Sequence, residues 1–228
     1  MPAGSVFDYA QLEIDSGQFL TAAQSLSRLT RKGVISRISK GKYYKPSQSK
    51  FGNSRPRESA IVDTLTVRQN RRIGYLTGLS VYNQLGLTSQ VSNTLVIATT
   101  NPLQPKKIEG YNVKYVKRNV RFLEEDVPLL QLLDALRDIK TIPDTNPDDS
   151  LKILKGRIAD LPKVKKGRLI TLALSFNPAT RALLGALMEE YFPSVKVSKL
   201  KQSINRLSVF ETGVTAELLS NKNSWNLI

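Results

Sequence analysis

Basic side chains are concentrated in one stretch of this sequence. This stretch gives the clearest indication of what the protein binds. Residues 28–57 contain ten Lys or Arg and no Asp or Glu: Arg28, Arg31, Lys32, Arg37, Lys40, Lys42, Lys45, Lys50, Arg55 and Arg57. So many unopposed cations are typical of a surface that neutralises the phosphates of a nucleic acid. The alternative is a solvated basic surface on an ordinary small domain.

Two absences from the composition exclude whole classes of catalytic chemistry. The chain has no cysteine, so it has no disulfide, no thiolate nucleophile and no Cys-ligated metal. It has no histidine either, which removes the Ser-His-Asp triad, the imidazole base and the His-metal site. Catalysis would have to rest on carboxylates, lysines, hydroxyls or magnesium. We therefore expect a binding protein, not an enzyme, without cofactor or metal.

The first element that positions the basic residues is a predicted helix from Thr21 to Lys32. Thr21 is a suitable N-cap residue, and Gln24 completes a capping box three residues later. Gly33 supplies the left-handed residue that ends a helix. Apolar residues at helical spacing predict one buried face: Ala22, Leu26 and Leu29. The other side carries Gln24, Ser27, Arg28 and Arg31.

The second element is a predicted basic hairpin. Residues 34–39 alternate like a half-buried strand, with Val34, Ile35 and Ile38 as the apolar positions. Residues 39–42 form the turn, and Tyr43 with Tyr44 begins the return strand, which closes at Pro46. Because neighbouring strand residues face opposite ways, one tyrosine is expected in the core and the other at the DNA backbone.

A basic helix followed by a basic hairpin predicts a winged helix-turn-helix that binds duplex DNA. The helix would enter the major groove while the hairpin, as the wing, follows phosphates or the minor groove. The predicted DNA-binding residues are Thr21, Gln24, Ser27, Arg28, Arg31, Lys32, Arg37, Lys40, Lys42 and Tyr43.

The rest of the chain predicts an α+β protein: a winged helix-turn-helix over 1–57, then a mixed α/β domain over 58–228 with a possible hinge at 141–150. A short strand or entry loop and then a helix are expected before Gln18. The other expected helices are 58–69, 78–86, one opened by Pro128, 149–159, 166–175, 177–191 and 196–206. The expected strands are 71–75, 94–100 and 111–117, and 207–216 is a strand or loop.

Composition is consistent with a globular protein that has a polyanionic partner. The 228 residues are 40% hydrophobic, with mean hydropathy −0.24 and net charge +15 from 34 basic and 19 acidic residues. Nucleic acid is the favoured partner, and an anionic membrane surface is second. No apolar run approaches the ~20 residues of a membrane span, and residues 1–4 do not resemble a signal peptide. A cytoplasmic protein is expected.

Several stretches resemble the AbiEi family, the antitoxin half of type IV toxin–antitoxin systems. They are LSRLTRKGVISRISKGKYY at 26–44, SKFG at 49–52, GLSVYNQLGLTSQV at 78–91 and RALLGALMEE at 181–190. The resemblance implies a winged helix-turn-helix repressor that binds inverted repeats in its own promoter. It also implies a role in phage defence, opposing a nucleotidyltransferase-like toxin without a stable complex. The family's DNA-contacting helix falls on residues 21–32 and its wing on 39–42.

Other charged groups leave alternatives open. The carboxylates of Glu124, Glu125 and Asp126 could bind metal in a nuclease, although before Pro128 they favour a helix start instead. A protein-interaction module that captures the toxin directly is another alternative. A second basic group, either a solvated surface or extra phosphate contacts, comprises Lys163, Lys165, Lys166 and Arg168, with Lys196, Lys199 and Lys201.

Overall fold

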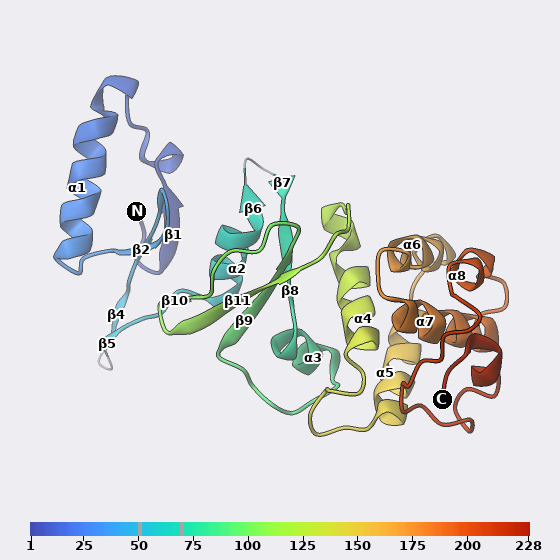
Figure 1. Ribbon diagram of the computed structural model, residues 1–228. Helices are drawn as coiled ribbons and strands as arrows, with labels where there is room; N and C mark the ends of the chain where they lie inside the picture. Colours follow the sequence, from blue (N-terminus) through green and yellow to red (C-terminus); the bar gives the residue numbers. More distant parts are fainter. Residues whose placement is uncertain (50–51, 69–70) are drawn as a thin grey trace. The chain divides into compact units, whose positions relative to one another are not determined.

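The computed structural model describes residues 1–49, 52–68 and 71–228, and divides into two compact units. Unit 1 comprises Met1–Tyr75 and Asn93–Val116, and unit 2 comprises Leu76–Ser92 and Lys117–Ile228. The chain is α+β, as predicted (Figure 1). The predicted boundary after residue 57 lies inside unit 1, and that domain division stays a prediction. Lys50 and Phe51, used in the sequence analysis, lie outside the described residues.

The N-terminal part of unit 1 is a small antiparallel sheet with one long helix. The strand order is β1 (Ser5–Asp8), β3 (Lys42–Lys45), β2 (Ser36–Ser39). Helix α1 (Phe19–Arg31) follows two 3-10 turns, η1 (Ala10–Leu12) and η2 (Ser16–Gln18). The helix expected before Gln18 is therefore replaced by 3-10 turns. The predicted hairpin is confirmed: β2 and β3 pair Ser39 with Lys42, and Gly41 has φ of +78° in the turn.

Both faces of this sheet are covered, which corrects one prediction. On one face Phe7, Leu26 and Tyr43 form a core cluster with Ile35, and α1 supplies the leucine. On the other face Tyr44 is 1% exposed, and its Oη lies 2.8 Å from Ser54 Oγ. Helix α2 (Glu58–Thr66) also packs against β2. Both tyrosines are consequently buried, so the prediction that one would lie at the surface is wrong.

The two ends of α1 differ in how well local sequence predicts them. The helix begins two residues before Thr21, with Gln18 at the N-cap and no side-chain cap, so the predicted capping box is wrong. The ring of Phe19, the first residue of the helix, lies 4.7 Å from the ring of Tyr9, measured between ring centroids. At the C-terminal end Gly33 has φ of +72°, and Val34 N donates to Leu29 O at 3.0 Å. This left-handed glycine termination confirms the predicted end.

Unit 1 also contains most of a four-stranded sheet, ordered β10 (Lys106–Ile108), β11 (Tyr111–Lys117), β9 (Thr94–Thr99), β8 (Gly74–Thr77). Helix α2 packs against β9. The predicted strands at 94–100 and 111–117 are confirmed. Two short ladders accompany this sheet: β4 (Gln48–Ser49) with β5 (Gly52–Asn53), and β6 (Val67–Arg68) with β7 (Arg71–Arg72).

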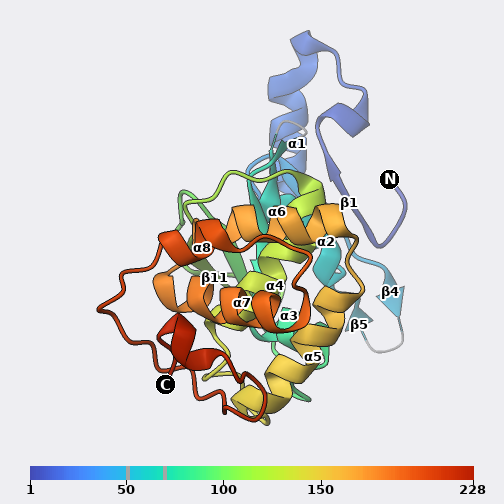
Figure 2. The ribbon, with the colours of Figure 1, turned by 90° about the vertical axis from the view of Figure 1, so that its right-hand side faces the viewer.

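Unit 2 is helical. Its elements are α3 (Leu79–Leu85), η3 (Glu124–Asp126), α4 (Val127–Arg137), α5 (Pro147–Ala159), α6 (Lys163–Ala173), α7 (Pro178–Tyr191), α8 (Ser198–Gln202) and η4 (Lys222–Trp225). Helix α4 packs against α5, α6 and α7, while α7 also contacts α8 and η4 (Figure 2). The buried leucines of α4 include those predicted: Leu129, Leu132, Leu133 and Leu136. No described helix is long and apolar enough to cross a membrane.

Capping side chains explain where two of these helices start. The Asn177 side chain accepts from Thr180 N at 2.8 Å, and Asn146 does the same for Asp149 N. A proline follows each asparagine in the first turn. The prediction for α7 is confirmed, whereas the predicted hinge at 141–150 is partly wrong because its last four residues begin α5. The helix predicted at 196–206 is shortened to α8.

Candidate nucleic-acid interface

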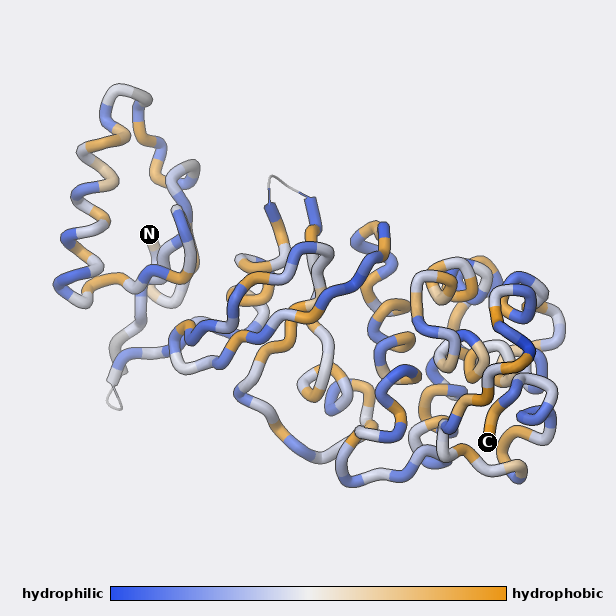
Figure 3. The backbone as a smooth tube through the Cα atoms, viewed as in Figure 1, coloured by the Kyte–Doolittle hydropathy of each residue, from blue (hydrophilic) through white to orange (hydrophobic). Residues whose placement is uncertain are grey.

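Helix α1 presents the predicted polar and basic residues to solvent. All six are exposed: Thr21, Gln24, Ser27, Arg28, Arg31 and Lys32. Helical spacing places Gln24, Arg28 and Arg31 along one stripe, opposite the buried Leu26. Hydrophilic and hydrophobic residues alternate along α1 in Figure 3, as expected for an amphipathic helix. The predicted exposure is confirmed, while contact with DNA stays a prediction.

The hairpin adds basic residues to the same small sheet. Arg37 and Lys40 are exposed and Lys42 is half-buried. In the register Arg37 lies opposite Tyr43, which lies opposite Phe7 on the next strand. Because directly paired residues share a face of the sheet, Arg37 lies on the face that α1 covers. Helix α1 and Arg37 therefore bring cations to one face of this sheet, whereas Lys42, next to Tyr43 in β3, lies on the other face.

A hollow of about 400 Å³ lies between α1 and the hairpin. Ser27, Thr30 and Arg31 line it from the helix, and Arg37 lines it from β2. Two guanidinium groups from different elements thus border one concave site. Planar guanidinium groups suit phosphate oxygens because they can donate two parallel hydrogen bonds. The hollow has the chemistry of a phosphate site.

Two tyrosines, Tyr9 and Tyr43, also line this hollow. Tyr43 is 4% exposed, and its Oη lies 3.2 Å from Tyr9 Oη. Burial raises the pKa of the Tyr43 phenol, and the hydrogen bond with Tyr9 raises it further. Tyr43 consequently remains a protonated hydroxyl at neutral pH.

The cations of this interface are electrostatically unopposed. Within the described ranges, no ion pair involves the basic residues of α1 or the hairpin: Arg28, Arg31, Lys32, Arg37, Lys40 and Lys42. Unit 1 as a whole has sixteen Lys or Arg and six Asp or Glu. Since an unpaired exposed cation keeps its charge available for a partner, this surface can release counterions on binding a polyanion.

The second basic group is largely engaged within unit 2. Arg168 Nη2 lies 2.6 Å from Asp126, and Lys165 Nζ lies 3.4 Å from Glu125. Lys166 Nζ donates to the carbonyls of Ala159 and Leu161, at the end of α5. These contacts favour a structural role for the group over the alternative of extra phosphate contacts.

The same contacts account for the acidic run before α4. Asp126 is 1% exposed; its carboxylate accepts from Arg168 and from Leu123 N. These hydrogen bonds, and above all the one from Arg168, hold the pKa of Asp126 below its ordinary value. Among the residues that the structure describes, no group of three His, Cys, Asp or Glu could hold a metal ion. These contacts favour the expected role of residues 124–126 at a helix start over the alternative of a metal site.

A buried polar network in unit 2 was not predicted. Asp134 is 0% exposed and accepts from Thr77 Oγ1 and from Arg118 Nε, each at 2.8 Å. The hydroxyl of Tyr82 donates to Asp138 at 2.6 Å. Burial, followed by the charge of Asp138, raises the pKa of Tyr82. The one signal in the sequence is that Asp134 stands among the leucines of α4. A carboxylate at such a position must have a partner if it is buried.

Comparison with known proteins gives one family match. The model of the DUF6088 family, described as a family of unknown function, matches residues 1–155. The matched range includes the whole of the interface described above. No curated protein and no solved structure matches the chain.

Proposed function

The chain belongs to the DUF6088 family of unknown function, and we propose that it is a DNA-binding transcriptional repressor. The observation that carries the proposal is the joint surface of α1 and the β2–β3 hairpin. Cations from both elements are exposed there and are not used in ion pairs within the described chain. Arg31 and Arg37 border one hollow between the two elements. Such a surface suits a partner with regularly spaced phosphates.

A winged-helix arrangement is the form we propose for this surface. The β1-β3-β2 sheet with α1 on one face supports it, with α1 as the groove helix and β2–β3 as the wing. Helix α1 has 13 residues and is about 20 Å long. The major groove of B-DNA, which is ~12 Å wide, admits an α-helix. The first helix of the usual pair is reduced to η1 and η2.

Side-chain chemistry separates base reading from backbone contact in this proposal. Gln24 and Ser27 can hydrogen-bond base edges, and Arg28 can pair with a guanine. Lys40 at the hairpin tip and Lys42 beside it hold the wing to phosphates. Thr21, Lys32 and the hydroxyl of Tyr43 complete the contact surface.

Binding of the purified full-length chain to duplex DNA from upstream of its own gene tests the interface. We expect Arg28→Ala to weaken specific binding by about 1–3 kcal/mol and relax specificity at one base pair. Lys42→Ala should weaken binding to all duplexes alike. Lys107→Ala, an exposed lysine in β10, is the matched control and should bind like wild type. Unchanged affinity in both interface variants would remove the site assignment.

The antitoxin role is proposed from the sequence resemblance to the AbiEi family. It would make the protein an autorepressor acting on inverted repeats, opposing a nucleotidyltransferase-like toxin without stable contact. A promoter reporter and co-expression with a neighbouring nucleotidyltransferase-like gene test the two parts separately. Repression together with rescue of growth, without co-purification, is the expected result. Stable co-purification would instead favour direct capture of the toxin, and absence of rescue would reject the antitoxin role.

A further inference from the structure

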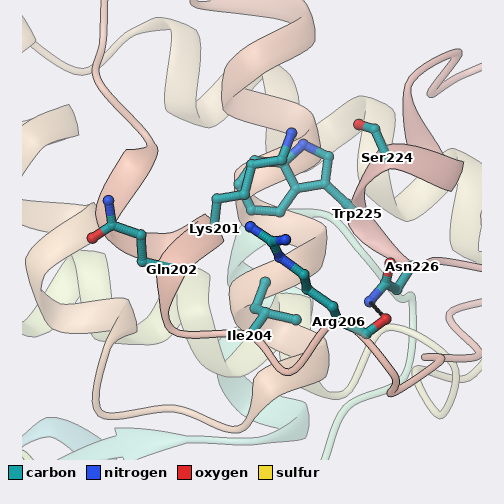
Figure 4. Close-up of a pocket in the computed structure, with 7 residues that line it drawn as sticks. All are labelled: Lys201, Gln202, Ile204, Arg206, Ser224, Trp225 and Asn226. Atoms are coloured by element: carbon teal, nitrogen blue, oxygen red, sulfur yellow. Dashed lines mark hydrogen bonds between the residues drawn. The ribbon is translucent and has the colours of Figure 1, made fainter.

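A second cavity lies entirely within unit 2 and outside the residues matched by the family model. Its volume is about 570 Å³, within the usual range of 300–1,000 Å³ for small-molecule sites. Figure 4 shows that Lys201 and Arg206 both reach this cavity, and that Trp225 forms part of its wall. Its lining contains two cations, polar side chains and Ile204, but no carboxylate among the described residues. Of these two cations Lys201 lies 3.7 Å from Glu189, so Arg206 contributes the unpaired positive charge of the cavity.

Lys201 and Trp225 are held in place by a shared carboxylate. Trp225 is 2% exposed, and its Nε1 donates to Glu189 Oε2 at 2.7 Å. Lys201 Nζ lies 3.7 Å from the other oxygen of Glu189 and 5.0 Å from the centre of the Trp225 ring. Because Trp225 also packs against Gly185 of α7, this wall is fixed to the helical core. The ammonium group of Lys201 therefore lies beside both Glu189 and the Trp225 ring.

Arg206 comes from the loop after α8, and its backbone is tied to the same wall. Asn226 Nδ2 donates to the carbonyls of Asn205 and Arg206, at 3.3 and 3.2 Å. Asn226 itself has a left-handed backbone with φ of +56°, a conformation uncommon outside glycine. Arg206 takes part in none of the ion pairs found in the described part of the chain. Its charge is available to a ligand.

We propose that this cavity binds the phosphate group of a small phosphorylated metabolite. Arg206 supplies an unpaired positive charge and can bind two phosphate oxygens at once, while Lys201, which shares Glu189, supplies a second N–H donor. Gln202 and Ser224 offer hydrogen bonds to a polar remainder of the ligand, and Ile204 offers an apolar contact. The site is separate from the proposed DNA interface and does not depend on it.

Trp225 is the single tryptophan of the chain, so its fluorescence reports occupancy of the cavity. We would titrate the full chain with ribose 5-phosphate and inorganic phosphate up to about 10 mM, a range that covers weak, millimolar sites. Neutral ribose and KCl at matched ionic strength are the controls. We expect a saturable fluorescence change with both phosphates and none with either control.

Substitutions of Arg206 test whether the phosphate binds in this cavity. Arg206→Ala should raise the Kd for ribose 5-phosphate at least about tenfold, the effect of losing one charge-assisted contact of about 1.4 kcal/mol. Arg206→Lys should retain part of the binding because the charge remains. Lys199→Ala, an exposed residue of α8 outside the cavity, is the matched control. Absence of a saturable change with both phosphates, an equal response to KCl, or unchanged binding in Arg206→Ala would each overturn the proposal.

Discussion

The salt dependence of DNA binding is the sharpest test of the interface, because the structure bounds its size. The free cations of α1 and the hairpin are Arg28, Arg31, Lys32, Arg37, Lys40 and Lys42. For B-DNA the slope of log K against log salt is about −0.9 for each phosphate neutralised. If every one of these cations contacts a phosphate, the slope approaches roughly −5. Affinity would then fall roughly a thousandfold between 50 and 200 mM salt.

The perturbation is the double variant Arg31→Gln with Arg37→Gln, which removes one cation from each side of the hollow. Two lost phosphate contacts should make the slope shallower by about 2 units. Fluorescence anisotropy with a labelled duplex at four KCl concentrations measures it. Lys165→Gln is the matched control, since this lysine already lies 3.4 Å from Glu125. Its slope should equal that of wild type.

Two results would refute this reasoning. A wild-type slope near zero would mean that phosphates do not bind this surface at all. A normal slope that the double variant leaves unchanged would place the phosphate contacts elsewhere on the chain. If Lys165→Gln alone made the slope shallower, the second basic group would be a DNA contact despite its internal ion pairs.

Four further predictions concern stability. Asp134→Ala should lower the free energy of unfolding by about 3–5 kcal/mol in urea denaturation, because it leaves a partly buried arginine unpaired. Asp126 has a lowered pKa, so its contribution is present above the ordinary carboxyl pKa and is lost as pH falls through the lower folded value. Urea titrations between pH 7 and 3 should show this loss in wild type and a smaller one in Asp126→Asn. Gly185→Ala should cost about 1–3 kcal/mol and shift tryptophan fluorescence because the new methyl would overlap the Trp225 ring. Gly156→Ala, within α5 and with open space around it, should instead raise the melting temperature.

Local chemistry in the sequence was enough to predict several elements of this fold. Gly33 ends α1 and Gly41 turns the hairpin, because each adopts a positive φ that other residues avoid. Asn177 with its following proline sets the start of α7. These features depend on a few neighbouring residues, so their residue types determine them. The exposure of Arg28 and Arg31 likewise followed from helical spacing around Leu26.

Contacts between distant residues decided the rest. The start of α1 moved from Thr21 to Phe19, whose ring packs against Tyr9. Tyr44 is buried beside Ser54 because both faces of the sheet are covered. The alternation of residues along a single strand could not predict this second covered face.

The charged residues show the same division. The sequence by itself determined that residues 28–57 are strongly basic, because charge is a property of residue type. Only the tertiary structure decided which cations remain available. Asp126 and Arg168 lie 42 positions apart yet form an ion pair, while Arg31 and Arg37 border one hollow without a carboxylate between them. Pairing needs an approach within a few ångströms, and chain folding, not sequence spacing, sets that distance.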